Sequence, residues 1–309
     1  MLDIVVIGSM NTDLVIKTAR MPAPGETLHG EDLQTIPGGK GANQAAAAAR
    51  LGSRVAMVGR VGADQFGPHL VNNLAHQGVN TGHVRVDPGS STGIALIMVD
   101  AQGENSILLS AGANGKVSRS DVDSASTLLS QARLLLLQFE IPMETVEYSL
   151  DKASKLGIKV ILNPAPAQVV EPGLLEKIDI LVPNQTELEI MSGLPVSDDE
   201  STRTAALALV NQGVEIVIVT LGERGALLVT SDESTFVPGI KVEVLDTTAA
   251  GDAFIGALAT AIVRNMTMKE AVRFANCAGA LAVTSFGAQP SLPSADEVYQ
   301  VYSRGFWRA

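Results

Sequence analysis

The chain has 309 residues, of which 46% are hydrophobic and 18% charged, a composition typical of a folded protein with a large core. Its net charge of −11, without any long run of Lys and Arg, argues against a nucleic-acid or anionic-membrane surface. The single cysteine, Cys277, excludes an internal disulfide framework, and MLDIVVIGSM does not read as an export signal, so we expect a cytoplasmic protein.

Short apolar runs alternate with helical patterns along most of the chain. The apolar runs predict buried strands at residues 4–7, 55–58, 134–139, 159–162, 178–182 and 216–220. Helical patterns occupy residues 42–51, 67–77, 122–130, 143–156, 186–191, 202–212, 250–264, 268–283 and 295–302. This alternation is typical of right-handed crossovers, so we expect one α/β domain over residues 1–309, with a doubly wound, mostly parallel sheet flanked by helices.

Two regions, at about residues 13–36 and 82–110, break this alternation. They contain β-type pieces at 14–17, 93–99 and 106–109, separated by turns rich in Gly and Pro. We expect them to form a small second sheet. An exposed sheet needs a partner face, which indicates a lid over a site, a contact with a second subunit, or both.

The glycine-rich stretch PGGKGANQ, at residues 37–44, leads directly into an alanine-rich helix. Its glycines let the backbone approach a ligand closely, while Lys40 and Asn43 offer a cation and an amide that can both donate and accept. A loop whose glycines serve only its turns is the alternative interpretation.

A second stretch, DTTAAGDAFIGAL at residues 246–258, places Asp252 after a run of small residues where a helix should start. An aspartate in that place can simply cap the helix. The backbone N–H groups of Ala249, Ala250 and Gly251 would, however, form an anion hole beside it. A carboxylate next to such a hole is what the transfer of a phosphoryl group to a hydroxyl requires, so we interpret Asp252 as a catalytic base.

Other common sites are missing from the sequence. It contains neither a Walker-type phosphate loop nor a dinucleotide-binding fingerprint after its first strand, and its four histidines are scattered. Cys277 stands among alanines and reads as small core filler.

The two glycine-rich stretches resemble the two signatures of the ribokinase family of carbohydrate kinases. Further similar stretches follow along nearly the whole chain: GSMNTD (8–13), NPAPA (163–167), VPNQTE (182–187), TLGERG (220–225) and SFGAQPS (285–291). The resemblance implies ATP-dependent phosphorylation of D-ribose at its 5-hydroxyl. It also implies ATP, Mg2+ and K+ as cofactors and a homodimer that pairs through the lid.

The resemblance further implies roles for individual residues. Asp252 matches the base, and Ala249, Ala250 and Gly251 match the anion hole. The positions that match sugar ligands are Asn11, Asp13, Gly38, Gly39, Lys40, Asn43, Glu140 and Asp252. Those that match the nucleotide side are Asn184, Thr220, Leu221, Gly222, Glu223, Arg224, Gly225, Gly251 and Asn276. Potassium positions are Asp246, Thr248, Ala282, Ser285, Gly287 and Ser291, and Glu187 matches a residue that holds magnesium through water.

Three other interpretations stay open. A sibling kinase could act on deoxyribose, another sugar or a nucleoside with the same apparatus. A non-catalytic sugar-binding sensor would need neither Asp252 nor the anion hole, and a nicotinamide dehydrogenase would need the missing dinucleotide fingerprint.

Overall fold

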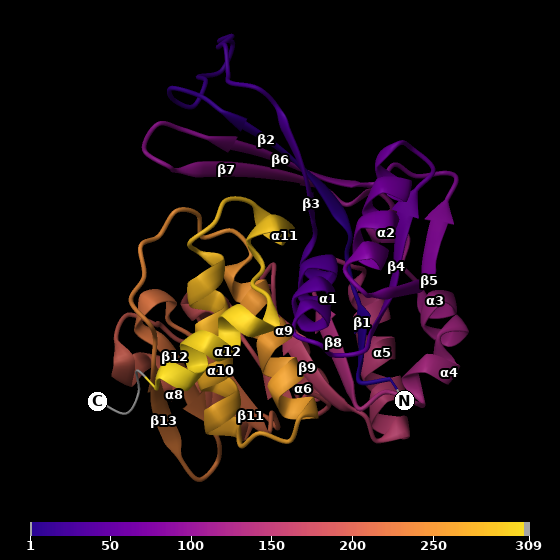
Figure 1. Cartoon of the computed structure of the whole chain (residues 1–309). Coiled ribbons are helices and arrows are strands. Elements are labelled where there is room, and N and C mark those ends of the chain that lie inside the picture. The colour runs from indigo at the N-terminus through magenta and orange to yellow at the C-terminus, as the bar shows by residue number, and fades with distance from the viewer. Residues whose placement is uncertain (1, 306–309) are drawn as a thin grey trace.

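The computed structural model describes residues 2–305, which form a nine-stranded sheet covered by helices and a separate four-stranded sheet (Figure 1). The fold class expected from the sequence is confirmed. The large sheet is ordered β13 (Ser234–Pro238), β12 (Gly225–Val229), β11 (Ile216–Thr220), β10 (Ile180–Leu181), β9 (Lys159–Asn163), β8 (Leu134–Gln138), β1 (Ile4–Ile7), β4 (Val55–Gly62) and β5 (Asn80–Asp87). Its pairs are parallel except for β11 with β12 and β12 with β13.

The order of the strands reverses between β1 and β8. From β1 the chain continues through β4 to β5 in one direction, and from β8 it continues through β9 and β10 to β11 in the other. Ligands of open α/β sheets bind in the crevice at the carboxyl ends of the strands beside such a reversal. The residues that follow β1 and β8 are therefore the first place to look for a site.

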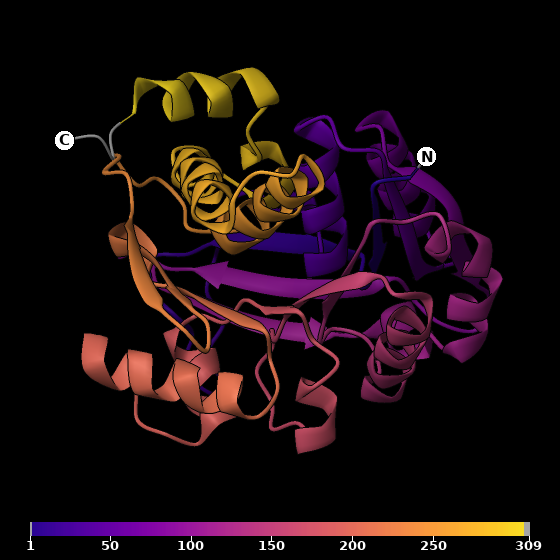
Figure 2. The same cartoon turned by 90° about the horizontal axis from the view of Figure 1, so that it is seen from below.

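Helices cover both faces of the large sheet (Figure 2). One face carries α1 (Lys40–Arg50), α2 (Phe66–His76), α9 (Ala250–Val263), α10 (Met268–Ala282) and α12 (Ala295–Arg304). The other carries α3 (Arg119–Ser124), α4 (Ser126–Leu129), α5 (Met143–Leu156), α6 (Pro172–Leu175), α7 (Gln185–Ser192) and α8 (Asp199–Asn211). Strand β1 shows why both faces are covered: Ile4 and Val6 pack into the first layer and Val5 and Ile7 into the second, all fully buried.

The smaller elements complete the chain. They are α11 (Ala288–Ser291) and the 3-10 turns η1 (Gly112–Lys116) and η2 (Gly222–Arg224). Within residues 2–305, none of the helices is long and apolar enough to cross a membrane.

The four-stranded sheet is ordered β3 (Gln34–Gly38), β2 (Asn11–Lys17), β6 (Gly93–Val99) and β7 (Asn105–Ser110), and we call it the lid. Asp13 lies opposite Ala95, and Val15 lies opposite Ile97, so these residues share one face. The other face carries a cross-strand row of Leu14, Leu96 and Leu108. Leu96 is 47% exposed and Leu108 is 68% exposed, so the lid presents an uncovered apolar surface.

The structure corrects the extent expected for the lid. Residues 82–87 belong instead to β5, which pairs with β4 at the edge of the large sheet. An edge strand alternates covered and exposed side chains as a lid strand does, so the sequence pattern could not separate the two. The helix expected at 122–130 is also interrupted, since α3 and α4 meet at Ala125.

Candidate active site

The carboxyl ends of β1 and β8 bring Ser9 and Glu140 together. One carboxylate oxygen of Glu140, Oε2, accepts hydrogen bonds from the hydroxyl of Ser9 and from the backbone N–H of Lys40, the latter at 3.1 Å. Lys40 is the first residue of α1, so a single carboxylate joins β1, β8 and the start of that helix. The reversal point of the sheet is thus lined by a fixed carboxylate.

The GGK turn packs closely against the first lid strand. Gly39 has φ 91°, and a Cβ on it would lie 2.6 Å from the backbone nitrogen of Asn11. A Cβ on Gly38 would lie 2.2 Å from Oδ2 of Asp13. Gly39 is required by its positive φ and by the nearby backbone, and a side chain at Gly38 would displace the Asp13 carboxylate.

Asp252 lies in the first turn of α9, where it faces α1. The residue that caps the helix is Ala249, with φ 60°, and Asp252 is the third helical residue. Its Oδ2 accepts from Asn43 Nδ2 at 2.9 Å, and its Oδ1 accepts from Gln44 Nε2 at 3.0 Å. Because the carboxylate bonds to side chains of α1 and Ala249 takes the cap position, the capping alternative is excluded.

The start of α9 offers fewer free donors than the sequence suggests. The N–H of Ala250 donates to the carbonyl of Thr247 at 3.3 Å, so it is engaged within the turn. Gly251 has open space where a Cβ would stand, and it lines a cavity of about 410 Å³ together with Ala250. The N-terminus of α9 therefore faces a cavity that Gly251 lines.

Charges in the site are strongly coupled. Burial, together with the fields of Glu140 and Asp252, raises the pKa of Asp13 to about 7. Burial alone would lower the pKa of Lys40, but the carboxylates of Asp252, Glu140, Glu187 and Asp13 outweigh it, and the pKa of Lys40 is raised. Lys40 is therefore held charged at the centre of an acidic site.

The 410 Å³ cavity gathers most of the residues expected on the nucleotide side. Those lining it are Thr220, Gly222, Glu223, Gly225, Gly251 and Asn276. Asn276 Nδ2 donates to the carbonyls of Val237 and Pro238, at 3.2 and 3.1 Å, which fixes its amide at the wall. Phe254 and Val242 supply apolar surface for a flat ring.

Three residues expected on that side lie elsewhere. Leu221 is buried in the core, and Arg224 forms an ion pair with Asp199 on α8. Asn184 caps α7, since its side chain accepts from the N–H of Glu187 while the Glu187 carboxylate accepts from the N–H of Asn184. Its backbone nevertheless pairs with Thr220, which keeps α7 beside the cavity.

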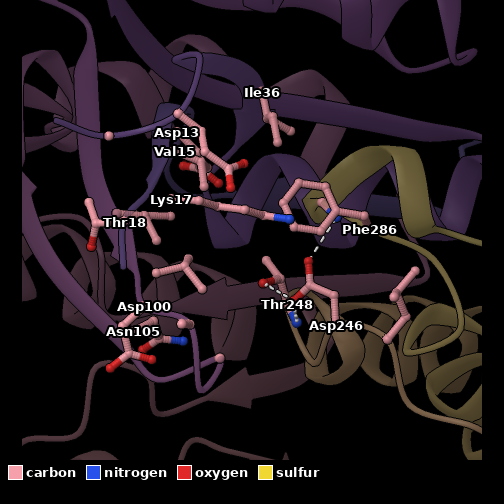
Figure 3. Close-up of a pocket in the computed structure, with 18 of the residues that line it drawn as sticks. Asp13, Val15, Lys17, Thr18, Ile36, Asp100, Asn105, Asp246, Thr248 and Phe286 are labelled. Carbon is pink, nitrogen blue, oxygen red and sulfur yellow. Dashed lines mark hydrogen bonds between the residues drawn. The ribbon is translucent and has the colours of Figure 1, made fainter. Parts of the chain in front are cut away.

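A second, larger cavity of about 770 Å³ lies between the lid and the body (Figure 3). Asp13, Val15 and Lys17 enter it from β2, and Asp246 and Thr248 enter from the segment before α9. The Nζ atom of Lys17 lies 4.8 Å from the centre of the Phe286 ring, so the lid touches the body at this point.

Asp246 ties together the loops expected to hold potassium. Its Oδ1 accepts from the N–H and the hydroxyl of Thr248, at 2.9 and 2.6 Å, and its Oδ2 accepts from the N–H of Gly287 at 2.8 Å. The hydroxyl of Ser291 donates to the carbonyl of Ala288 at 2.8 Å, and the N–H of Ser285 donates to the carbonyl of Ala282 at 3.3 Å. The segments 246–248 and 282–291 thus form one connected unit.

The sequence did not single out several residues that hold the site together. Ser9 and Gln44 stand inside the quoted motifs GSMNTD and PGGKGANQ, so their neighbours were a signal. Asn114 had none: it is buried in η1, and its Nδ2 donates to Asn11 Oδ1 at 2.7 Å and to the carbonyl of Met10 at 3.1 Å. Asn114 thereby fixes the point where the chain leaves β1 for the lid.

The cavity under the lid and the cavity at the start of α9 adjoin at Val244 and Thr247, and the buried carboxylate of Asp252 follows in the first turn of α9. Fold and site together are those of an α/β carbohydrate kinase. The chain matches the family model described as pfkB family carbohydrate kinase over residues 1–295, and it belongs to that family.

Individual relatives cover nearly the whole chain. A ribokinase of Haemophilus influenzae is 42% identical over 295 residues, 96% of each chain. A deoxyribokinase of Salmonella typhi is 43% identical over 303 residues, 98% of this chain and 99% of that protein. The structure of Arabidopsis thaliana ribokinase complexed with ribose and ATP superposes with a TM-score of 0.90 at 36% identity, covering 98% of this chain and 99% of that one. The family identified from the sequence motifs is confirmed.

Proposed function

We propose that the protein transfers the γ-phosphoryl group of ATP to the 5-hydroxyl of D-ribose, giving ribose 5-phosphate and ADP. The observation that carries the proposal is the buried carboxylate of Asp252, which bonds to Asn43 and Gln44 and directly follows Gly251, a residue that lines the 410 Å³ cavity. The relatives named ribokinase, and the neighbour solved with ribose and ATP, favour this sugar and this nucleotide.

In the proposed reaction Asp252 accepts the proton of the 5-hydroxyl while the sugar oxygen attacks the γ-phosphorus. The bond from that phosphorus to the bridging oxygen breaks, and ADP leaves with the electron pair. Gly251 and its neighbours at the start of α9 stabilise the charge on the transferring group. Lys40 adds a cation on the acceptor side.

The sugar would be held by Asn11, Asp13, Gly39, Asn43 and Glu140. Asn43 is suited to this because its Nδ2 donates to Asp252, while its buried Oδ1 has no hydrogen-bond partner among the described residues. A sugar hydroxyl would satisfy that oxygen. Pairs of carboxylate and amide groups suit a polyol, since each can hold two hydroxyls.

The donor sets fit the two cations of the proposal. The Glu187 carboxylate accepts from the N–H of Asn184 through Oε2, and its Oε1 would bond to the water shell of a Mg2+ ion. Magnesium supplies charge neutralisation on the phosphates. The segments 246–248 and 282–291, joined through Asp246, offer the backbone carbonyls and a carboxylate that a K+ ion takes.

We further propose a homodimer that pairs through the exposed apolar row of the lid, in the cytoplasm. A reaction that consumes ATP, and a buried thiol in a chain with one cysteine, fit a reducing compartment.

Deoxyribose is the second candidate substrate, because a relative named deoxyribokinase is as similar to this chain as the relatives named ribokinase. ADP release should be measured with ribose, deoxyribose, fructose and adenosine, each with potassium or sodium. The proposal expects the highest kcat/KM with ribose and potassium. A preference for deoxyribose would correct the substrate, and no turnover with any acceptor would refute the kinase assignment.

A further inference from the structure

The two oxygens of the Asp252 carboxylate are held in different ways. Oδ2 is bonded by Asn43, a residue proposed to bind sugar as well, whereas Oδ1 is bonded by Gln44 at 3.0 Å. Gln44 is fully buried in α1, among other side-chain amides. Among the residues proposed to take part in the reaction, the side chain of Gln44 bonds only to the base, Asp252.

The amide of Gln44 is fixed in orientation by a second glutamine. Gln138, the last residue of β8, donates from Nε2 to Gln44 Oε1 at 2.7 Å. This bond assigns the oxygen of Gln44 to the side of Gln138 and its NH2 group to the side of Asp252. If the Gln44 amide were flipped, its NH2 group would face the NH2 group of Gln138, and its oxygen would face Oδ1 of Asp252.

The strand next to β8 supplies a further anchor. Gln44 Nε2 also donates to Asn163 Oδ1 at 3.2 Å, and Asn163 Nδ2 donates to the carbonyl of Val182 at 3.2 Å. Gln138 is fully buried and Asn163 is 7% exposed, so these amides are shielded from water. We call Gln44, Gln138 and Asn163 the amide relay.

The relay starts at the rigid centre of the molecule. Gln138 and Asn163 stand at the carboxyl ends of the central strands β8 and β9, which pair in register at these two residues. A Cβ on Gly8, at the end of β1, would lie 2.2 Å from Gln138 Oε1, so the closing glycine of β1 leaves room for the relay. The bonds from Gln138 to Gln44 and from Gln44 to Asp252 thus link the end of β8 to the carboxylate on α9.

We propose that Gln44 is a positioning residue for the base: the amide relay holds Oδ1 of Asp252 to the sheet, which aims Oδ2 at the acceptor hydroxyl. The inference rests on the proposed function, because it assumes that Asp252 is the base. It adds that the orientation of the carboxylate is set by residues of the sheet. The Oδ1 atom of Asn43 can then bond the sugar. Buried side-chain amides that bond one another restrict each other's orientation; in this network Oε1 of Gln138 has no hydrogen-bond partner among the described residues.

The test compares Gln44→Met with Thr260→Val. Methionine keeps the length of glutamine without its donor, and Asp252 then retains the bond from Asn43 alone. Thr260 provides a matched control, because its hydroxyl lies 2.9 Å from that of Ser53 and links α9 to the residues after α1 in the same buried interface. Both variants lose a buried polar link between α9 and the region of α1, and Gln44→Met also loses the bonds of Gln44 to Gln138 and Asn163.

We expect Gln44→Met to lower kcat by roughly 10–100-fold, the cost of misaiming a reacting group, with the KM for ATP within about twofold of wild type. Thr260→Val should lower the midpoint of thermal unfolding but leave kcat within about twofold of wild type. A kcat for Gln44→Met near wild type, or an equal loss in Thr260→Val, would overturn the inference while wild-type activity keeps the proposed function standing.

A double-variant cycle separates positioning from a general structural effect. If Gln44 acts only through the base, Gln44→Met should change the residual kcat of Asp252→Asn by less than about threefold, since groups that act as a unit are not additive. A further loss as large as in the wild-type background would overturn the inference.

Should Gln44→Met not fold, Gln138→Met tests the same relay one step from the base. It should lower kcat in the same direction, and an unchanged kcat would overturn the inference as well. A wild-type protein that phosphorylates none of the four acceptors would instead refute the proposed function, and the role of Gln44 with it.

Discussion

Asp252 differs from a helix cap in the origin of its hydrogen bonds. A capping aspartate accepts from backbone N–H groups of its own helix, as Asp198 does from Ser201 at the start of α8. Asp252 instead accepts from two side-chain amides of α1. A carboxylate that is buried and oriented by another helix is suited to act as a base.

The pair Asp252 and Asp198 gives the first prediction. Asp252→Asn should lower kcat by roughly 10²–10⁴-fold while sugar and ATP still bind, because a positioned base contributes about that much. Asp198→Asn should leave kcat unchanged and cost at most about 1 kcal/mol of unfolding free energy. Steady-state kinetics and calorimetric binding check both, and turnover near wild type in Asp252→Asn would return the residue to a structural role.

The second prediction concerns Asp13, whose pKa is raised to about 7 from an ordinary value of 3.8. A carboxyl with a raised pKa in the fold contributes stability that is present below pH 3.8 and is lost as the pH rises through about 7. Asp13→Asn should therefore gain stability relative to wild type by roughly 2 kcal/mol between about pH 5 and pH 8. Thermal unfolding without sugar measures it, and a difference that does not change with pH would show that the Asp13 carboxyl is not held protonated by burial and its acidic neighbours.

Motifs predicted candidate residues for the sugar and for the base, but not the residues that orient them. Lys40, Asn43 and Asp252 could be read from two short stretches because small residues and a charge at fixed spacing are rare by chance. Asn114 and Gln138 could not, since each acts through a partner distant in sequence, Asn114 through Met10 and Gln138 through Gln44. Such contacts follow from the pairing of strands, which local patterns do not specify.

At the scale of elements, the start of α9 depends on two loops that Asp246 joins. Removing its carboxylate would free Thr248 from Gly287 and separate the segments 246–248 and 282–291. The turn at Thr247, whose carbonyl holds Ala250, would then lose its support.

The third prediction follows from this arrangement. Potassium should raise kcat above its value in sodium for the wild type, and Asp246→Ala should abolish the difference. Asp179→Ala is the control, because that carboxylate also accepts from a backbone N–H, that of Val160, far from the site. If the ratio of activities in potassium and sodium were the same in Asp246→Ala and wild type, the ion site would lie elsewhere.

Element types were easier to predict than element membership. The buried strands 134–139 and 216–220 were found because continuous apolar runs of that length fit a strand covered on both faces. Residues 82–87 were counted with the lid although they belong to β5, and β12 and β13 were not predicted, although each pairs with the strand next to it in sequence. The helix break at Ala125 does not interrupt the apolar spacing of residues 122–130, so the sequence pattern gave no sign of it.

On the scale of the whole molecule, the lid has one face over the cleft and one face uncovered. Leu14, Leu96 and Leu108 form a row on the uncovered face, and a row of leucines in water is unfavourable. Pairing with the lid of a second copy would bury it, and a symmetric dimer achieves this with one surface.

The fourth prediction tests that dimer. Leu108→Glu should give a monomer with weaker sugar affinity, because an unbraced lid closes less readily over the cleft. Val169→Glu is the matched control, since Val169 is 79% exposed but lies in the loop between β9 and α6. Light scattering at working concentration decides it: a wild-type monomer with full sugar affinity would show that the lid acts alone.

In the proposed reaction a phosphoryl group is transferred to the oxygen at carbon 5 of ribose. The most direct measurement is the proton-coupled phosphorus NMR spectrum of the product formed from ribose and ATP. A phosphate on carbon 5 is coupled to the two hydrogens of a CH2 group, so we expect a triplet, together with one ADP for each sugar phosphate. A doublet, from a phosphate on a CH carbon, would contradict the position of transfer, and ADP with inorganic phosphate alone would contradict the transfer itself.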